Sequence, residues 1–215
     1  MARESRPGVR SKKRWRARLI DWVLKDIRRR AGVFIDESWF VLWAHQAEGW
    51  AERRRPERIP KDKSWDRKHR PPSSALYATM DVERREVAGE WHDTWNQEET
   101  WAHLQEVIKS YQARGIRYLV VFWDHAPWHT AQSIKHKVAE HNRQVKREGG
   151  VRVHLFHLPI RAPWLMPLEA VFGQTKRAVG TRTREQMADL QAAVERRLLR
   201  RNARVRKHSQ QPMLS

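Results

Sequence analysis

The chain of 215 residues contains no cysteine. Disulfide bonds, zinc–thiolate centres and cysteine nucleophiles are therefore excluded. Any metal ion that the protein holds must be bound by oxygen atoms or imidazole nitrogens. The candidates for metal chemistry are thus the 25 acidic residues and the 11 histidines.

Long apolar segments are also missing. No stretch reaches the roughly 18 uncharged apolar residues that a membrane span requires, and the longest apolar runs have the length of single strands. The basic start of the chain leads into no sufficiently long apolar stretch and no small-residue cleavage site, so it does not have the pattern of a secretory signal. We therefore expect a cytoplasmic protein that makes no membrane contact.

Acidic residues are few relative to basic ones. The chain has 44 lysines and arginines against 25 aspartates and glutamates, which gives a net charge of +19 and a pI near 11.2. This excess is larger than solubility requires and favours a polyanion such as DNA as the partner. Because 40% of the residues are hydrophobic, the chain can also bury a sizeable core, and its length fits one domain with or without appended arms.

Basic residues are concentrated in residues 1–30, which we expect to form an N-terminal helical arm. The apolar side chains of this arm have helical spacing: Trp15, Leu19, Ile20, Trp22, Val23 and Ile27. Such a helix either packs on the domain or contacts DNA directly as the remnant of a DNA-binding region, and the pattern leaves both interpretations open. Residues 31–205 are predicted to form the domain, and residues 206–215 a disordered tail. The basic segment from Glu52 to Pro72 predicts a surface loop or insertion.

Residues 31–205 alternate between strand and helix patterns, which indicates the α/β class. VFIDE, residues 33–37, and WFVLW, residues 39–43, are separated by one polar residue and predict two adjacent strands. The remaining patterns predict a strand and hairpin at 75–91, a helix from Asn96 to Gly115, a strand at 118–123, a helix at 130–146, a strand at 151–158, and two helices between 167 and 203 that separate near Gly180. We expect a mixed sheet flanked by helices.

Three acidic residues occupy positions from which their side chains can converge. Asp36 lies in the first strand, Asp124 follows the strand at 118–123, and Glu169 lies early in a helix. The carboxyl ends of parallel strands form the crevice where ligands bind, and carboxylates are preferred ligands of Mg²⁺. Taken singly, each residue is equally well explained by a turn, a helix cap or an interaction with the helix dipole.

Three sequence blocks add a family resemblance to this pattern. VFIDESWF at 33–40, LVVFWDHAPWHTA at 119–131 and FHLPIRAPWLMPLEAVFGQTKRAV at 156–179 together resemble the DDE transposase domain of the Tc/mariner-like insertion-sequence superfamily. Each block alone is weak, but the three occur in the family's order on strand, strand and helix. The similarity spans roughly residues 31–200.

The resemblance implies an RNase H-like fold in which Asp36, Asp124 and Glu169 are both the catalytic and the metal-binding residues. The implied reaction is metal-assisted cleavage of transposon ends, followed by attack of the freed 3′-hydroxyl on target DNA. Mg²⁺ is the implied cofactor, and Mn²⁺ is expected to substitute for it because both ions prefer oxygen ligands. The implied partner is double-stranded DNA, at transposon ends and target, in the nucleoid. A homodimer and a separate DNA-reading domain or chain are left open.

The sequence departs from the family pattern at several positions. Met166 replaces an asparagine and Ala162 a serine, so a supporting polar contact is expected to be lost. His125 replaces another asparagine, and the interval from Asp124 to Glu169 is longer than usual. There is also little room before Asp36 for helix-turn-helix domains, which suggests a truncated or split transposase.

Several residues near the blocks are candidates for DNA contact: Trp128, His129, Trp164, Lys176 and Arg177. The two tryptophans can stack on bases, although aromatic residues are more often part of a core. The histidines of this region, at 125, 129, 154 and 157, are interpreted as polar wall residues or phosphate contacts rather than transition-metal ligands. Glu37 points to the opposite strand face from Asp36 and is excluded from the triad.

Two other functions remain compatible with the sequence. An inactive, truncated transposase could act only as a DNA-binding protein, but the presence of all three acids argues against it. Another RNase H-like nuclease, such as a junction resolvase, would use the same fold on a different substrate. A basic protein that merely coats nucleic acid would show no metal dependence.

Overall fold

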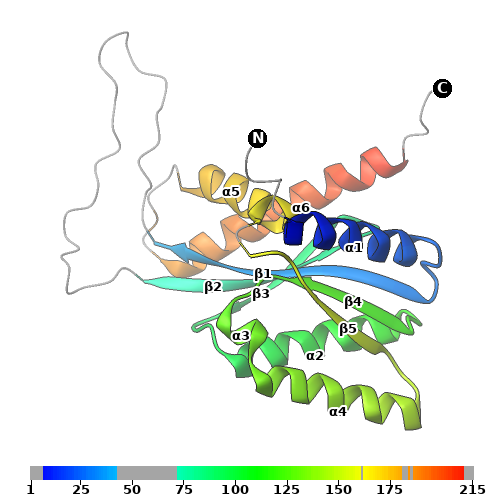
Figure 1. The fold of residues 1–215 in the computed structure, drawn as a ribbon. Coiled ribbons are helices and arrows are strands. Elements are labelled where there is room, and N and C mark those ends of the chain that lie inside the picture. The colour runs from blue at the N-terminus through cyan, green and yellow to red at the C-terminus, as the bar shows by residue number, and fades with distance from the viewer. Residues whose placement is uncertain (1–6, 43–71, 161, 181–183, 185, 211–215) are drawn as a thin grey trace.

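The computed structural model describes residues 7–42, 72–160, 162–180, 184 and 186–210 (Figure 1). The elements follow in the order α1 (Pro7–Leu24), β1 (Arg30–Val41), β2 (Ser73–Asp81), β3 (Val87–His92), α2 (Gln97–Ala113), β4 (Tyr118–Trp123), α3 (Pro127–Thr130), α4 (Gln132–Glu148), β5 (Arg152–His157), the 3-10 turn η1 (Pro163–Leu165), α5 (Pro167–Val179) and α6 (Met187–Gln210). This is the predicted alternation of strands and helices.

The five strands form one mixed sheet in the order β3-β2-β1-β4-β5. β1 is antiparallel to β2 and parallel to β4, and β4 is parallel to β5. The prediction of two strands at 33–37 and 39–43 is wrong, because β1 continues through Ser38. This serine is buried and keeps its register with Leu76 on β2, so a single polar residue does not end the strand. The predicted hairpin is confirmed as β2 and β3.

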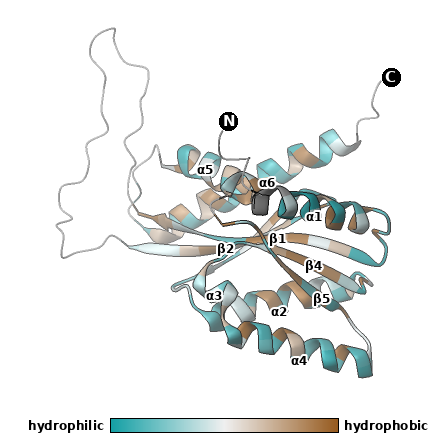
Figure 2. Ribbon diagram, in the orientation of Figure 1, coloured by the Kyte–Doolittle hydropathy of each residue, from teal (hydrophilic) through white to brown (hydrophobic). Residues whose placement is uncertain are grey.

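Helices cover both faces of the sheet. α1, α5 and α6 lie on one face, and α2, α3 and α4 lie on the other (Figure 1). Alternate residues of β1 serve the two layers: Phe34 packs in the core with α5 and α6, whereas Val33 and Ile35 pack in the core with α2 and α4. Figure 2 shows mainly hydrophobic residues along the strands, whereas the surrounding helices carry many hydrophilic residues. The sheet is thus buried on both sides.

Helix α1 is part of this domain. Val23 is 1% exposed within the core, and Leu19, Ile20 and Trp22 pack against it. The guanidinium of Arg30 lies 4.2 Å from the centre of the Trp22 ring, which fixes the connection between α1 and β1. The structure shows α1 packed on the domain, and contact of its basic side with DNA stays a prediction.

One short helix was not predicted, and the C-terminal boundary differs from the prediction. The helix predicted at 130–146 is confirmed as α4, and the unpredicted α3 precedes it, separated from it by the non-helical backbone of Ala131 (φ −55°, ψ 140°). The tail predicted from residue 206 is wrong for residues 206–210, which continue α6, and residues 211–215 lie outside the described part. The predicted loop at 52–72 also lies outside the described residues, except for Pro72.

No described helix is both long and apolar enough to cross a membrane.

Candidate active site

Two acidic residues stand next to each other at the ends of neighbouring parallel strands. In the parallel register of β1 and β4, Phe34 is paired with Phe122. Asp36 follows Phe34 by two positions, and Asp124 follows Phe122 by two positions. Asp36 is still inside β1, and Asp124 is the first residue after β4. The two aspartates therefore lie at the edge of the sheet where ligand crevices form in α/β proteins.

Glu169 approaches the same place from the helical layer. It lies in the first turn of α5, which begins with Pro167, a residue suited to the first helical position. Met166 at the N-cap position makes no side-chain hydrogen bond, so the polar contact expected to be lost at this position is absent. One cavity of about 310 Å³ is lined by Asp36, Asp124 and Glu169. The structure thus brings the three predicted carboxylates together.

Asp36 is a buried acid with few compensating groups. It is 9% exposed, and its Oδ1 accepts a hydrogen bond from the backbone N–H of Glu37 at 3.0 Å. Desolvation, followed by repulsion from Glu37, Asp124 and Glu169, raises the pKa of Asp36 from 3.8 to about 8. Without a cation, Asp36 therefore keeps its proton up to about pH 8, and a bound cation would favour the ionised form of Asp36 and offset the repulsion between the acids.

Asp124 is held by His129. The Nδ1 of His129 lies 2.7 Å from Asp124 Oδ1, and its Nε2 lies 2.8 Å from Glu37 Oε1. Burial alone would lower the pKa of His129, but the hydrogen bonds to Asp124 and Glu37 raise it to about 9. The imidazole is therefore protonated at neutral pH and donates to both carboxylates. Desolvation of Asp124 is outweighed by the hydrogen bonds from His129 and from the Ala126 N–H, which lower the pKa of Asp124.

This arrangement corrects the predicted DNA contact of His129. Its side chain is 0% exposed and its ring stacks on Trp123 with a centroid distance of 4.7 Å. Both ring nitrogens are engaged by carboxylates, so His129 cannot reach DNA. Glu37 also accepts a hydrogen bond from Trp128 Nε1 at 3.1 Å, and its exclusion from the triad stays a prediction. Glu37 and His129 instead position Asp124.

Basic groups lie at the rim of the acidic cavity. Lys12 on α1 places its Nζ 3.3 Å from Nε2 of His125, the residue after Asp124. Burial and the nearby Lys12 lower the pKa of His125. Lys176 on α5 is half-buried, and burial lowers its pKa, although Glu169 and Asp36 oppose this effect. Negative and positive charge are therefore adjacent.

The other predicted DNA contacts have different environments. Trp164 in η1 is 43% exposed, and Arg177 on α5 is exposed, so both side chains are accessible. Trp128 is partly buried against Trp95, with ring centroids 5.3 Å apart. Their role in DNA binding stays a prediction.

The oxygen donors of the site suit a hard divalent cation such as Mg²⁺ or Mn²⁺. Within the described residues, no three acidic or histidine side chains are arranged closely enough to hold a metal ion by themselves. Mg²⁺ does not need such an enclosure, because one or two carboxylates usually hold it together with water and substrate phosphate. The cluster of Asp36, Asp124 and Glu169, in which Asp36 ionises only with difficulty, fits this mode of binding because a bound cation would stabilise its carboxylate form.

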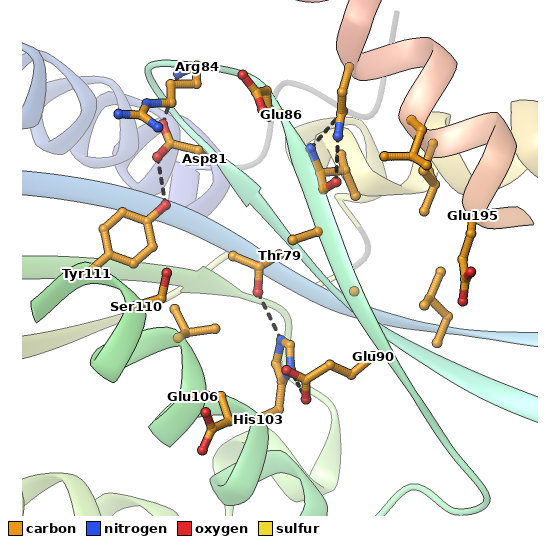
Figure 3. Close-up of a pocket in the computed structure, with 18 of the residues that line it drawn as sticks. Thr79, Asp81, Arg84, Glu86, Glu90, His103, Glu106, Ser110, Tyr111 and Glu195 are labelled. Carbon is orange, nitrogen blue, oxygen red and sulfur yellow. Dashed lines mark hydrogen bonds and ion pairs between the residues drawn. The ribbon is translucent and has the colours of Figure 1, made fainter. Parts of the chain in front are cut away.

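A larger cavity of about 770 Å³ lies away from these carboxylates, over β2 and β3 and between α2 and α6 (Figure 3). Its polar groups bind one another. Tyr111 donates to Asp81 Oδ2 at 2.6 Å, and Thr79 Oγ1 is 2.9 Å from His103 Nε2. These bonds join α2 to the sheet, so we assign the cavity a structural role despite its size.

Two contributions to the site were missed by the sequence analysis. Lys12 is 113 residues from His125, and no local pattern indicates that α1 reaches the rim of this cavity. The role of His129 had a signal, since it follows Asp124 by five residues across a turn that contains Pro127. That spacing allows the side chain to fold back onto the aspartate.

Comparisons with known proteins agree with this geometry. The sequence profile of the family described as DDE superfamily endonuclease matches residues 32–191. No curated protein sequence is significantly similar to the chain. The fold is similar to the Mos1 transposase paired-end complex with left transposon end, with a TM-score of 0.57 and 16% identity over 91% of this chain and 59% of that chain. For the catalytic domain of Mos1 mariner transposase, the TM-score is 0.51 and the identity 17%, over 93% and 90% of the two chains.

The chain thus spans less than two thirds of the transposase chain in the paired-end complex, but nearly all of the separate catalytic domain. At these identities the likeness establishes the fold, which is RNase H-like. The family match covers most of the chain and includes Asp36, Asp124 and Glu169. The chain belongs to the DDE superfamily endonucleases.

Proposed function

We propose that the protein is the catalytic domain of a DNA transposase that cleaves transposon ends and joins them to target DNA. The observation that carries this proposal is the group of three carboxylates around one cavity, with the pKa of Asp36 raised by desolvation and by its acidic neighbours. Such a group is unfavourable unless a cation binds. The net charge of +19 supplies the complementary affinity for DNA.

Each residue of the site has a role in this proposal. Asp36, Asp124 and Glu169 would hold Mg²⁺ or Mn²⁺ together with water and substrate phosphate, and the ion would supply charge stabilisation for the attacking and leaving oxygens. His129 keeps Asp124 ionised and fixed. Lys12 at the rim provides positive charge for the phosphate next to the reacting one. No covalent enzyme intermediate is required.

The similar structures support the choice of substrate and metal. Their titles describe Mos1 complexes with a left transposon end, with Mn and with Mg. We propose that double-stranded DNA, at transposon ends and target, is the partner of this chain. A second copy of the chain and a DNA-reading domain or chain that acts with it are further parts of the proposal. The corresponding location is the nucleoid in the cytoplasm.

Nicking of supercoiled plasmid tests this proposal. We expect nicking with Mg²⁺ and with Mn²⁺, none with a chelator, and none by the Asp124→Asn variant. Asp93→Asn is the matched control, because Asp93 is exposed and precedes α2, outside the site. Equal nicking by Asp124→Asn and wild type would disprove the role of the triad.

The products distinguish the alternatives. Joining of a labelled transposon end to a second DNA molecule supports transposition. Metal-dependent nicking without joining would indicate another RNase H-like nuclease. DNA binding without nicking under any metal condition would indicate an inactive remnant.

A further inference from the structure

Helix α1 connects the acidic cavity with a second, basic cavity. Lys12 reaches His125 at the rim of the acidic cavity. One helical turn later, Arg16 lines a separate cavity of about 420 Å³ between α1, the turn after β2, α5 and α6. Along α5 the two cavities are also adjacent, since Glu169 lines the first and Ala170 the second.

Three arginines from different elements line this second cavity: Arg16 from α1, Arg85 from the turn between β2 and β3, and Arg201 from α6. Arg16 lies over the ring of Phe34, 5.0 Å from its centre, and its buried Nε has no hydrogen-bond partner among the described residues. Arg201 is held in place by its hydrogen bond to the backbone oxygen of Arg85 at 2.7 Å. The fold therefore fixes three cations around one space.

The cavity contains little negative charge to balance them. Asp81 is the one acidic residue of its lining, and both of its carboxylate oxygens are occupied. Oδ1 accepts from the N–H groups of Glu83 and Arg84, and Oδ2 accepts from Tyr111 and Arg114. In the described part of the chain, none of the three arginines forms an ion pair with an acid. Burial lowers the pKa of Arg16, and burial together with Arg85 lowers that of Arg201.

The basic lining continues along α6. A further cavity of about 210 Å³ shares Arg201, Val171 and Gln174 with the second one and is also lined by Arg197 and Arg204. We call this continuous surface the arginine groove; it consists of Arg16, Arg85, Arg197, Arg201 and Arg204. Five cations that line two cavities with shared residues, with one already paired acid, repel one another unless an anion lies among them.

We propose that the arginine groove binds consecutive phosphates of the DNA strand whose neighbouring segment enters the acidic cavity. The proposal rests on the proposed function and adds the path of the DNA on this domain. Guanidinium groups bind phosphate oxygens through two parallel hydrogen bonds, and groups from separate elements fit a repeating anion better than a single one. Lys12 lies between the groove and the site and continues the path of positive charge to the reacting phosphate.

The test is the affinity for a 30-base-pair duplex, measured in chelator over a series of salt concentrations. The groove variant carries Arg16→Gln, Arg85→Asn and Arg201→Gln; asparagine is chosen because Arg85 has a positive φ of 57°. The control variant carries Arg143→Gln, Lys146→Gln and Arg147→Gln, which remove the same charge from exposed positions on α4, on the opposite layer.

We expect the groove variant to bind DNA about tenfold or more weakly near 0.1 M salt, and the slope of log K against log salt to fall by about 2 to 3. The control variant is expected to lose less than about threefold. Equal losses in the two variants would overturn the proposal. Release of DNA by millimolar inorganic phosphate at matched ionic strength would also overturn the proposal, because it would show that the groove binds free phosphate rather than a DNA strand.

A second variant covers loss of folding. If thermal unfolding shows that the groove variant is not folded, Arg197→Gln with Arg204→Gln replaces it, because no hydrogen bond or ion pair of these two side chains is found within the described residues. Its control is Arg143→Gln with Arg147→Gln.

Measurements of DNA binding and of nicking also separate the groove proposal from the proposed function. Metal-dependent nicking with unchanged DNA affinity in the groove variant rejects the groove alone, and reduced affinity without any nicking by wild type rejects the proposed function alone.

Discussion

Asp36 and Asp81 are two buried strand aspartates with opposite surroundings. They are 9% and 8% exposed, respectively. Asp81 receives four hydrogen bonds, from two backbone N–H groups, Tyr111 and Arg114. Asp36 receives one from its neighbour's N–H group, and three other acids surround it. A buried acid whose oxygens are satisfied joins elements of the fold, whereas a buried acid left to repel other acids is a candidate functional group, here for the proposed binding of a cation.

The largest expected effect separates the two aspartates by activity. We expect Asp36→Asn to reduce metal-dependent nicking to the level seen with chelator, because it removes a metal ligand. Asp81→Asn is expected to retain nicking but to lower the free energy of unfolding by about 2 to 3 kcal/mol, because charged hydrogen bonds are lost. Plasmid nicking and denaturant unfolding measure the two effects. Loss of nicking by a folded Asp81→Asn protein would contradict the comparison.

A second effect concerns the stability of the metal-free protein. Folding raises the pKa of Asp36 from 3.8 to about 8, so between these pH values the folded state holds a proton that the unfolded state has released. The contribution of Asp36 to stability is therefore lost as pH rises through this window. The Asp36→Asn side chain does not titrate, so the variant does not lose stability in this way. Its free energy of unfolding is expected to exceed that of wild type by a few kcal/mol near pH 8 and to differ little near pH 4.

Urea unfolding in chelator at several pH values measures this difference. Mg²⁺ is then expected to stabilise wild type at pH 8 by an amount that Asp36→Asn largely lacks, because a ligand that binds only the folded state stabilises it. Parallel stability curves for the two proteins from pH 5 to 9 would show that the repulsion at Asp36 is not relieved by the substitution.

The sequence predicted the parts of the site that depend on local pattern and chain order. The apolar run before Asp124 predicted β4, and two possible caps, Thr94 or Asn96, predicted the start of α2. In the structure Asn96 is the cap, and its side-chain oxygen accepts a hydrogen bond from the Glu99 N–H. The triad was predicted from the resemblance of three blocks, and the structure places Asp36, Asp124 and Glu169 around one cavity. Their metal-binding role stays a prediction.

The sequence did not predict features that depend on packing. Ser38 was interpreted as a break, but its burial beside β2 keeps β1 continuous, because tertiary pairing overrides a single polar residue. His129 was interpreted as a surface contact, because sequence alone does not show that its ring is covered by Trp123. The arginine groove joins residues from α1 and α6, which are distant in the chain, so no spacing within either helix could indicate it.

The smallest expected effect compares two buried histidines. His129 links Glu37 to Asp124, whereas His103 links Thr79 to Glu90 in the structural cavity. We expect His129→Gln to lower activity or metal affinity by about 10 to 100-fold, because a residue that orients a metal ligand acts through it. The readout is the Mg²⁺ concentration for half-maximal nicking, with the DNA concentration dependence unchanged. His103→Gln is the matched control, expected to reduce stability without moving this Mg²⁺ midpoint. A shift of the midpoint by both variants would mean that general loosening of the fold, rather than positioning of Asp124, controls the site.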